Sequence, residues 1–399
     1  MGKITRNFYL YSNFLLVIAL ITMGTSFSKF HVIGPIYLHD FVLMLLAISA
    51  IANLPRRLPF IPIVILLLIS LFYLVISLVL MRTLPELVIR QYAIFGYLGC
   101  SYLIFSKTLG TPFHSYKNFI FRVGVLSVLI QILYIVYLVS NGVSVLDEYH
   151  YYSPATVLGI IIFGASIFAF VKSAVLKFTL FAFTLLLSAT TGHSSAALSL
   201  IFVLGVYLLF KVTNKSKLII AGGGLFVLLA LYLLLPQFRD NNAGFRLITW
   251  SYTIKRIFLE NFGLIGEGFG IPYFDTTLIS ELYYKVGSEG FYAPGREYEG
   301  YVSSVHNSFL TIFLSVGFLP GLLIFLPFKR LLSYMNTTNE LRTPDADFIF
   351  LSLVGISVWI SFNEILELPH AACLFWLVYF CSLSIPSKDS IATQKANRN

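Results

Sequence analysis

Long apolar runs recur along this 399-residue chain and limit its fold more than any other feature. A helix needs about 20 predominantly apolar residues to cross a bilayer. Twelve runs meet or approach this length: Phe8–Phe27, Tyr37–Asn53, Pro59–Met81, Val88–Phe105, Phe119–Val139, Pro154–Phe170, Leu176–Ala189, Ala196–Phe210, Leu218–Leu235, Val305–Leu326, Phe348–Phe362 and Ala371–Ile385. We therefore predict an all-α polytopic membrane protein with about twelve transmembrane helices and both termini on one side.

The composition excludes a soluble globular protein. Charged residues make up only 11% of the chain, hydrophobic residues make up 58%, and the mean hydropathy is +0.85. A soluble domain carries about 25% charged residues to cover its surface. No repeat of fixed period and no Pro- or Ser-rich linker divides the chain, so we interpret residues 1–399 as a single membrane domain.

The basic residues predict the orientation, because short cytoplasmic loops are enriched in Lys and Arg. With the N-terminus inside, 18 of the 27 basic residues fall in cytoplasmic segments and only three in short outer loops. The net charge of +9 is therefore a topology signal and gives no reason to expect nucleic-acid binding. The first apolar run lacks a signal-peptidase site. We expect a bacterial inner-membrane protein with both termini in the cytoplasm.

One long outer loop, Pro236–Ser304, is the largest soluble segment and is expected to be periplasmic. Within it, Gly244–Leu259 has apolar residues at helical spacing, which predicts a helix on the membrane surface with Trp250 at headgroup level. Four glycines in Asn261–Gly270 then end this helix. Six of the seven histidines lie on or near the outer side, so any chemistry should face outward.

Gly266, Gly268 and Gly270 alternate after this helix and have two interpretations. The simpler one is a tight turn that needs glycine backbone freedom. The other is that these glycines let backbone amides approach a phosphate or a sugar. A nucleotide-binding motif is excluded because no strand precedes them.

His306 and Asn307 stand where the chain enters the tenth predicted span. In a structural interpretation, Asn307 or Ser304 caps the helix and His306 lies among the headgroups. In a functional interpretation, a neutral imidazole accepts a proton near neutral pH and a helix N-terminus attracts anions. That combination suits a base beside a phosphorylated substrate.

Four basic residues of the long loop are candidate anion ligands. Arg239, Arg246, Lys255 and Arg256 cluster close to the predicted membrane surface. Solvated side chains are the simpler interpretation, but bidentate arginine contacts would suit a lipid diphosphate presented there.

The short polar link Thr190–Ser195 joins two apolar runs and is most simply a turn. His193 and Ser194 become candidate site residues only if this link folds beside the long loop. Elsewhere, His, Asp and Glu residues show no metal-ligand spacing, so we expect neither a metal nor another cofactor.

The order of these motifs resembles the bacterial O-antigen polymerase and O-antigen ligase superfamily. Arg246 and Trp250 form an Arg-x-x-x-Trp helix, a Gly-x-Gly-x-Gly break follows, and His306-Asn307 opens a span that contains Gly317–Gly321. The resemblance covers residues 190–326, and the twelve-span layout agrees across the rest of the chain. Members of this superfamily are metal-independent, inverting membrane glycosyltransferases that act on undecaprenyl-diphosphate-linked sugars.

The resemblance implies a role for each motif. Arg246 would engage the diphosphate, and His306 would deprotonate or orient the acceptor hydroxyl. Further substrate contacts would come from Asn307, Trp250, Arg239, Arg256, Gly266, Gly268, Gly270, His193 and Ser194. The family often has an Arg in the short outer link, where this chain has His193. Either His193 substitutes for it, or a second cation comes from Arg239, Arg256 or a residue near Arg82 or Arg90.

Three functions follow as hypotheses. The first is a polymerase that joins undecaprenyl-diphosphate-linked repeat units, which the missing link Arg and the Gly-x-Gly-x-Gly break favour. The second is a ligase that moves the finished polysaccharide onto lipid A-core. The third is a transporter without enzymatic activity, which is disfavoured because charged residues lie near the span ends. The expected partners are undecaprenyl-diphosphate-linked oligosaccharides, membrane lipids and a chain-length regulator protein.

Overall fold

The computed structural model describes residues 3–27, 30–33, 36–51, 60–80, 84–108, 113–143, 152–211, 242–275, 278, 305–329 and 343–383. The α-helices are α1 Lys3–Phe27, α2 Leu38–Ile51, α3 Ile61–Leu80, α4 Pro85–Thr108, α5 Phe113–Ser140, α6 Pro154–Phe170, α7 Ala174–Ala189, α8 Ser194–Lys211, α10 Asn242–Lys255, α13 Ser308–Val316, α14 Phe318–Gly321, α16 Pro344–Ile360 and α17 Pro369–Leu383. The structure also has a π-helix, η2 Arg256–Glu260, and a 3₁₀ helix, η3 Leu322–Phe325, which is followed by further helical residues at 326–329. Within these ranges the strands are one antiparallel hairpin, β1 His31–Ile33 and β2 Ile36–Tyr37.

Within the described ranges, four helices are long and apolar enough to cross a membrane: Arg6–Gly24 of α1, Ile61–Leu80, Pro85–Thr108 and Ser115–Ser140 of α5. Shorter apolar helices of 10–17 residues accompany them, including α2, α6, α7 and α17. The chain is therefore an α-helical membrane protein, as predicted, while the number of about twelve spans remains a prediction. The predicted ninth span, Leu218–Leu235, lies outside the described residues.

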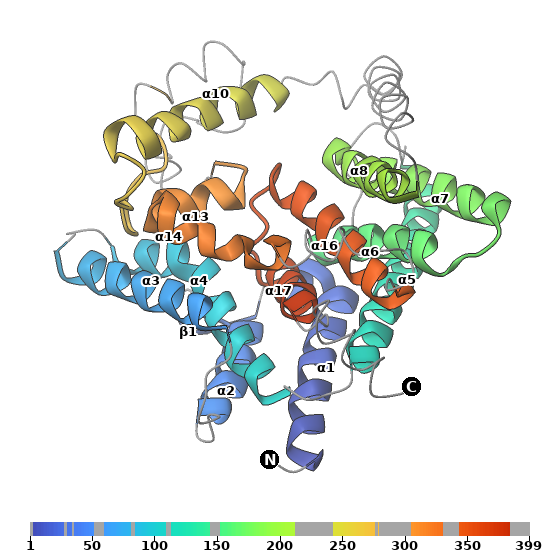
Figure 1. The fold of residues 1–399 in the computed structure, drawn as a ribbon, viewed down its shortest axis with the longest axis horizontal. Helices are drawn as coiled ribbons and strands as arrows, with labels where there is room; N and C mark the ends of the chain where they lie inside the picture. The colour runs from blue at the N-terminus through green and yellow to red at the C-terminus, as the bar shows by residue number, and fades with distance from the viewer. Residues whose placement is uncertain are drawn as a thin grey trace, which may run out of the picture.

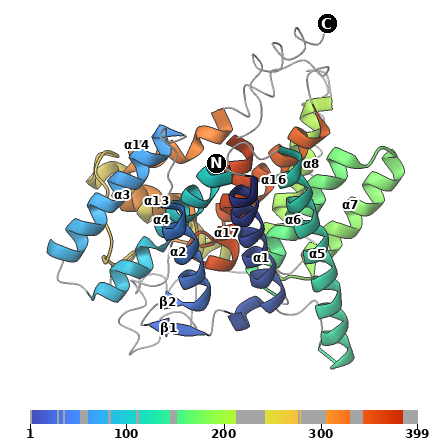
Figure 2. The ribbon, with the colours of Figure 1, turned by 90° about the horizontal axis from the view of Figure 1, so that it is seen from below.

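Helix α17 lies at the centre of the bundle, and all 15 of its residues are buried. It packs against α1, α4, α6 and α16. Figure 1 shows α2, α3 and α4 on one side of it and α5 to α8 on the other, and Figure 2 shows the same division from below. A helix that is apolar on every side is buried either in a protein core or in lipid, and α17 is buried in the protein core.

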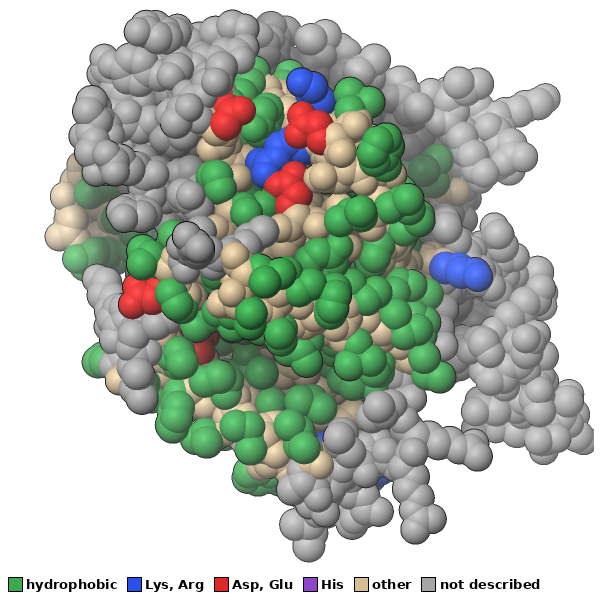
Figure 3. Space-filling model, turned by 90° about the vertical axis from the view of Figure 1, so that its left-hand side faces the viewer, with side chains coloured by type: hydrophobic (Ala, Val, Ile, Leu, Met, Phe, Trp, Pro, Cys, Tyr) green, Lys and Arg blue, Asp and Glu red, His purple; other side chains and the backbone are tan. Residues whose placement is uncertain are grey.

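Helix α3 has the opposite character, because half of its apolar side chains are exposed. Leu68 and Phe72 are about three-fifths exposed, and Val79 and Leu80 more than two-thirds. Figure 3 shows a broad apolar surface on this side of the molecule, with a small group of charged side chains above it. Such a surface suits contact with lipid tails, which are the expected solvent for a membrane-crossing helix.

The predicted span Val305–Leu326 is broken into pieces instead of forming one helix. Helix α13 ends at Val316, Gly317 adopts a φ of 89°, and α14 and η3 follow. A Cβ atom on Gly317 would lie 2.6 Å from the Leu264 carbonyl oxygen, so the loop segment after η2 packs directly into the break. The Phe318 amide donates to the Gly263 carbonyl at 3.1 Å and holds the segment there.

The helix predicted over Gly244–Leu259 is confirmed as α10 followed by the π-helix η2. Figure 1 shows α10 lying across one end of the bundle, above α13 and α14. The rest of the long loop, apart from residues 261–275 and Leu278, lies outside the described residues.

Candidate functional site

Hydrogen bonds tie three links together at the end of the bundle that α10 covers. The Asn363 side-chain amide, between α16 and α17, donates to the Ser195 hydroxyl at the start of α8, at 2.9 Å. The Ser308 hydroxyl at the start of α13 donates to the Asn363 carbonyl at 3.2 Å. The same hydroxyl accepts from the amides of Ile365, at 2.9 Å, and Leu366, at 3.2 Å. Segments far apart in the sequence are thus fixed beside one another.

Trp250 attaches α10 to this group of links. Its indole N–H donates to the Val305 carbonyl at 3.1 Å, and its ring lies 5.3 Å from the Phe362 ring. Trp250 was predicted to lie at headgroup level and to contact substrate; in the structure its side chain is half-buried against the protein. Trp250 therefore positions α10 over the end of the bundle.

These contacts bring four titratable side chains together: Arg246 of α10, His193 of the α7–α8 link, His306 and Glu364. Arg246 lowers the pKa of both histidines, and Glu364 raises the pKa of His306. Such effects act only between charges that lie near one another, since solvent and salt screen distant ones. We call this group the Arg246–His306 cluster.

His306 has an unusual backbone conformation, with a φ of 49°. A non-glycine residue in the left-handed region is strained, and such strain is concentrated at functional sites. The imidazole lies edge-on to the Phe245 ring with the centroids 5.4 Å apart. Burial lowers the pKa of His306 below its ordinary value of 6.5; Glu364 partly opposes this effect and Arg246 adds to it. His306 is therefore neutral at pH 7 and can accept a proton.

Asn307 is the N-cap of α13, as its structural interpretation predicted. Its side-chain oxygen accepts from the amides of Phe309 and Leu310, both at 3.1 Å. A side-chain oxygen in this position satisfies donors that the first helical turn leaves unpaired. The oxygen of Asn307 is therefore committed to the fold, and Ser304, the alternative cap, lies outside the described residues.

His193 meets the condition that its role required, because the charge of Arg246 on α10 reaches its imidazole. Its ring lies edge-on to Trp359 at 6.2 Å, and its amide donates to the Thr191 hydroxyl at 3.3 Å. Burial lowers the pKa of His193 to about 4, and Arg246 contributes to the shift. His193 is thus a neutral group beside the guanidinium, not a replacement cation, and Ser194 follows it as the first residue of α8.

Arg256, which was predicted to bind substrate, instead holds the loop together. Its Nε donates to Glu267 at 3.1 Å, and its Nη2 makes a second contact with the same carboxylate. Its Nη1 donates to the carbonyls of Pro272, at 3.1 Å, and Tyr273, at 2.6 Å. All three nitrogens of the guanidinium therefore have partners within the protein. Arg239, the other proposed cation of the loop, lies outside the described residues.

The turn after η2 lies at residues 262–264, before the Gly-x-Gly-x-Gly break, and the three glycines of the break serve close packing instead. The amide of Gly266 donates to the Tyr73 hydroxyl at 2.9 Å, and that of Gly270 donates to the Gln91 side chain at 2.6 Å. The Gly268 amide donates to the Ser315 carbonyl at 3.0 Å. A Cβ on Gly266 would lie 2.3 Å from that same carbonyl oxygen. The glycines therefore permit close packing of the loop on α3, α4 and α13, and these amides are already bonded.

Glu364 of the cluster and two residues near it, Glu367 and Tyr273, were not singled out in the sequence. Burial raises the pKa of Tyr273 well above its usual range; Glu367 and Glu364 add to this shift and Arg90 opposes it. Glu364, Glu367 and Arg90 therefore all lie near Tyr273. The available sequence signal was the pair of glutamates in a short link between apolar runs, at the predicted outer side.

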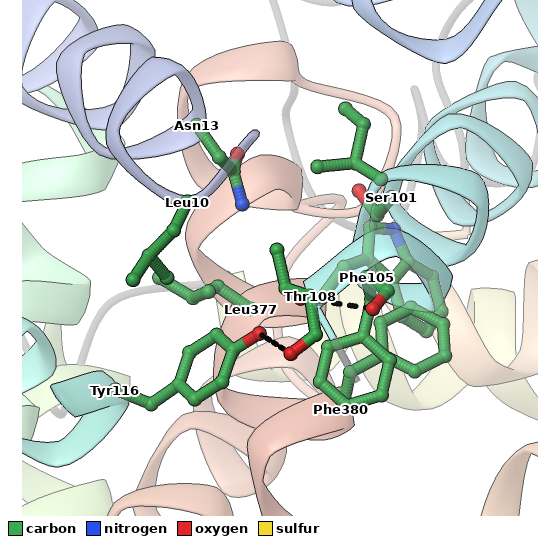
Figure 4. Close-up of a pocket in the computed structure, with 10 residues that line it drawn as sticks. Leu10, Asn13, Ser101, Phe105, Thr108, Tyr116, Leu377 and Phe380 are labelled. Carbon is green, nitrogen blue, oxygen red and sulfur yellow. Dashed lines mark hydrogen bonds between the residues drawn. The ribbon is translucent and has the colours of Figure 1, made fainter. Parts of the chain in front are cut away.

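A small cavity at the opposite end of α4 and α17 is a poor candidate for a substrate site. Figure 4 shows its lining, in which the Tyr116 hydroxyl donates to the Thr108 carbonyl at 3.4 Å. Asn13 and Ser101 contribute the other labelled polar side chains. Its volume is about 10 Å³, which is room for one water molecule at most.

Neither a protein-family model, nor a curated protein, nor a solved structure matches the chain. Within the described residues, no group of three or more His, Cys, Asp or Glu side chains is placed to hold a metal ion. The functional argument therefore depends on the geometry of the Arg246–His306 cluster.

Proposed function

We propose that this chain is a polysaccharide polymerase that joins undecaprenyl-diphosphate-linked oligosaccharide repeat units at the outer face of the bacterial inner membrane. The observation that carries the proposal is the meeting of a strained, neutral histidine, an arginine and a glutamate at one end of the helix bundle. Arg246, His306 and Glu364 supply the cation, the neutral base and the carboxylate that glycosyl transfer from a lipid diphosphate needs.

In the proposed reaction, an acceptor hydroxyl oxygen attacks the anomeric carbon as the bond from that carbon to the diphosphate oxygen breaks. The hydroxyl proton passes to the neutral imidazole of His306, and the configuration at the carbon inverts. Glu364 stabilises the resulting imidazolium, as a carboxylate does beside a catalytic histidine. Arg246 neutralises the charge that develops on the leaving diphosphate.

A second cation for the diphosphate is best supplied by Arg90. The side chain of Arg256 is bonded to Glu267, and His193 is neutral, so neither adds positive charge to the site. Arg90 lies on α4 and is exposed. Its charge lowers the pKa of Tyr273 and the charge of Glu364 raises it, so both residues lie near this tyrosine. This arrangement supports Arg90 as the residue that takes the place of the link Arg of the superfamily.

The proposal is tested by complementing a deletion strain with full-length variants and measuring surface polysaccharide. Arg246→Ala and His306→Gln should each lower chain extension by about 10²–10³-fold, which is the usual cost of losing one electrostatic or acid–base group. Lys255→Gln removes a charge from the same helix and is the matched control, because its side chain is 63% exposed. Chain length and amount that stay at the wild-type level in both site variants would refute the proposal.

The deletion strain also identifies the acceptor. Loss of a polymerase should leave a single repeat unit on lipid A-core, and a chain-length regulator would then have nothing to act on. Loss of a ligase should leave bare core and accumulated lipid-linked polymer. The second result would replace the polymerase proposal with a ligase that uses the same cluster.

A further inference from the structure

A second polar cavity, of about 640 Å³, lies at the end of the bundle opposite to the Arg246–His306 cluster. The start of α5, the end of α6, the α6–α7 link, the end of α8 and the start of α16 form its walls. Helix α16 runs from this cavity towards the cluster, so about 25 Å separates the two sites. The cavity is therefore distinct from the proposed site of glycosyl transfer.

Three lysines from different segments line the cavity: Lys117 of α5, Lys172 of the α6–α7 link and Lys177 of α7. Two aspartates, Asp345 and Asp347, line it as well, so its formal charge is +1. Basic residues at the end of a helix are the usual sign of a cytoplasmic face. Here the segments that carry the three lysines pack together, so the lysine side chains line one concave surface.

Aromatic side chains hold two of these lysines in place. The Nζ of Lys117 lies 3.1 Å from Asp345 and 5.4 Å from the centre of the Phe170 ring. The Nζ of Lys177 donates to the Tyr207 hydroxyl at 2.8 Å and lies 4.9 Å from the centre of that ring. A hydroxyl and a ring face orient an ammonium group without cancelling its charge. Lys177 therefore presents a fixed positive charge to the cavity.

Helix α7 continues from the cavity with an apolar, exposed face. Val175 is 79% exposed and Leu186 is 69% exposed, with Leu176, Phe178 and Phe183 exposed between them. Figures 1 and 2 both place α7 at the edge of the molecule. This face gives a hydrocarbon chain a surface to lie on directly beside the lysines.

We propose that this cavity binds the phosphate headgroup of an anionic phospholipid whose acyl chains lie along α7. Basic pockets between transmembrane helices bind such headgroups, and each lysine near the phosphate strengthens the attraction. Inorganic phosphate would use the lysines but not the apolar face of α7, so the combination selects a lipid. The inference is independent of the proposed glycosyl transfer.

The test is native mass spectrometry of the full-length protein in detergent, with phosphatidylglycerol or phosphatidylcholine added in equal amounts. The wild-type protein should retain phosphatidylglycerol preferentially. The Lys172→Gln/Lys177→Gln variant should lose about fivefold in retention for each lysine. Lys172→Arg/Lys177→Arg keeps the charge and should retain the lipid. Lys255→Gln, on α10, removes a charge elsewhere and should behave as the wild type does.

Equal retention of the two lipids by the wild-type protein would overturn the proposal, as would undiminished phosphatidylglycerol binding by the double Gln variant. The same holds if Lys255→Gln loses as much binding as that variant does, since the effect would then be general. Displacement of the bound lipid by millimolar inorganic phosphate would assign the cavity to a soluble anion and would also overturn it.

Discussion

The side-chain amide of Asn363 donates a 2.9 Å hydrogen bond to the hydroxyl of Ser195, two buried residues that stand 168 positions apart in the chain. Asn363 immediately precedes Glu364, and Ser195 lies two residues after His193. This one bond therefore holds together the links that carry two members of the Arg246–His306 cluster. Buried hydrogen bonds between links assemble the site. Substitutions that remove these bonds therefore test the assembly separately from the chemistry.

Ser308→Ala should destabilise the protein and lower its activity together. The hydroxyl of Ser308 accepts from the buried amides of Ile365 and Leu366, and its loss would leave them unsatisfied. Each unsatisfied buried donor costs about 1–3 kcal/mol, so the midpoint of thermal unfolding in detergent should fall by several degrees. The control is Ser140→Ala, whose exposed hydroxyl bonds only within its own helix. Equal unfolding midpoints for the two variants would count against the linking role of Ser308.

Arg256→Gln should lower stability through the loop. The side chains of Arg256 and Glu267 are only 11% and 17% exposed, and removing one partner of a buried pair costs about 3–5 kcal/mol. The neighbouring Lys255 pairs with Glu260 at 4.0 Å on the surface, so Lys255→Gln should change the free energy of unfolding by less than about 0.5 kcal/mol. Unfolding midpoints of both purified variants compare these costs. A stable but inactive Arg256→Gln protein would return Arg256 to the list of diphosphate ligands.

The contrast between Arg246 and Arg256 shows where sequence reasoning ends. The helical spacing of Gly244–Leu259 was sufficient to predict α10, because apolar periodicity depends on local sequence. The two arginines are ten positions apart, which places them about 80° apart around an α-helix. Arg256 pairs with Glu267, which lies eleven residues further on and beyond a turn. The position of Glu267 depends on how the glycine segment packs on α3 and α13. That packing cannot be predicted from the sequence of the helix.

Gly266→Ala should prevent that packing. A Cβ at this position would lie 2.3 Å from the Ser315 carbonyl oxygen, and backbone atoms on both sides cannot give way cheaply. We expect a loss of folded protein, measured as the monodisperse fraction after size-exclusion chromatography in detergent. Gly96→Ala is the matched control, since nothing lies within 4 Å of a Cβ there, and an alanine within α4 should be neutral or stabilising by about 0.5–1 kcal/mol. A normal yield for Gly266→Ala would show that the glycine segment can move away.

Hydropathy predicted most of the helices but not the members of the site that lie in links. The bounds of α6, α16 and α17 agree with apolar runs because burial in lipid or protein demands such runs. Glu364 lies between two runs, and its nearness to His306 depends on Asn363 and Ser308, whose hydrogen bonds join distant parts of the chain. The break at Gly317 was likewise not predicted from hydropathy, because it is caused by the loop that packs against it.

The pH dependence of chain extension should report the protonation of His306. The reaction needs the neutral imidazole, and burial lowers its pKa below 6.5, so the rate should be constant above neutral pH and fall only in acid, below that value. Glu364 raises this pKa, so Glu364→Gln should move the acid limb to still lower pH. The maximal rate should also drop, because the imidazolium formed in the reaction loses its carboxylate. Polymerisation measured with a lipid-linked repeat unit between pH 4.5 and 8.5 gives both quantities. His193→Gln is the reference, because it removes the other imidazole of the Arg246–His306 cluster while His306 keeps its carboxylate. An acid limb that vanished in this variant, or that shifted upward in Glu364→Gln, would assign the titration to a different group.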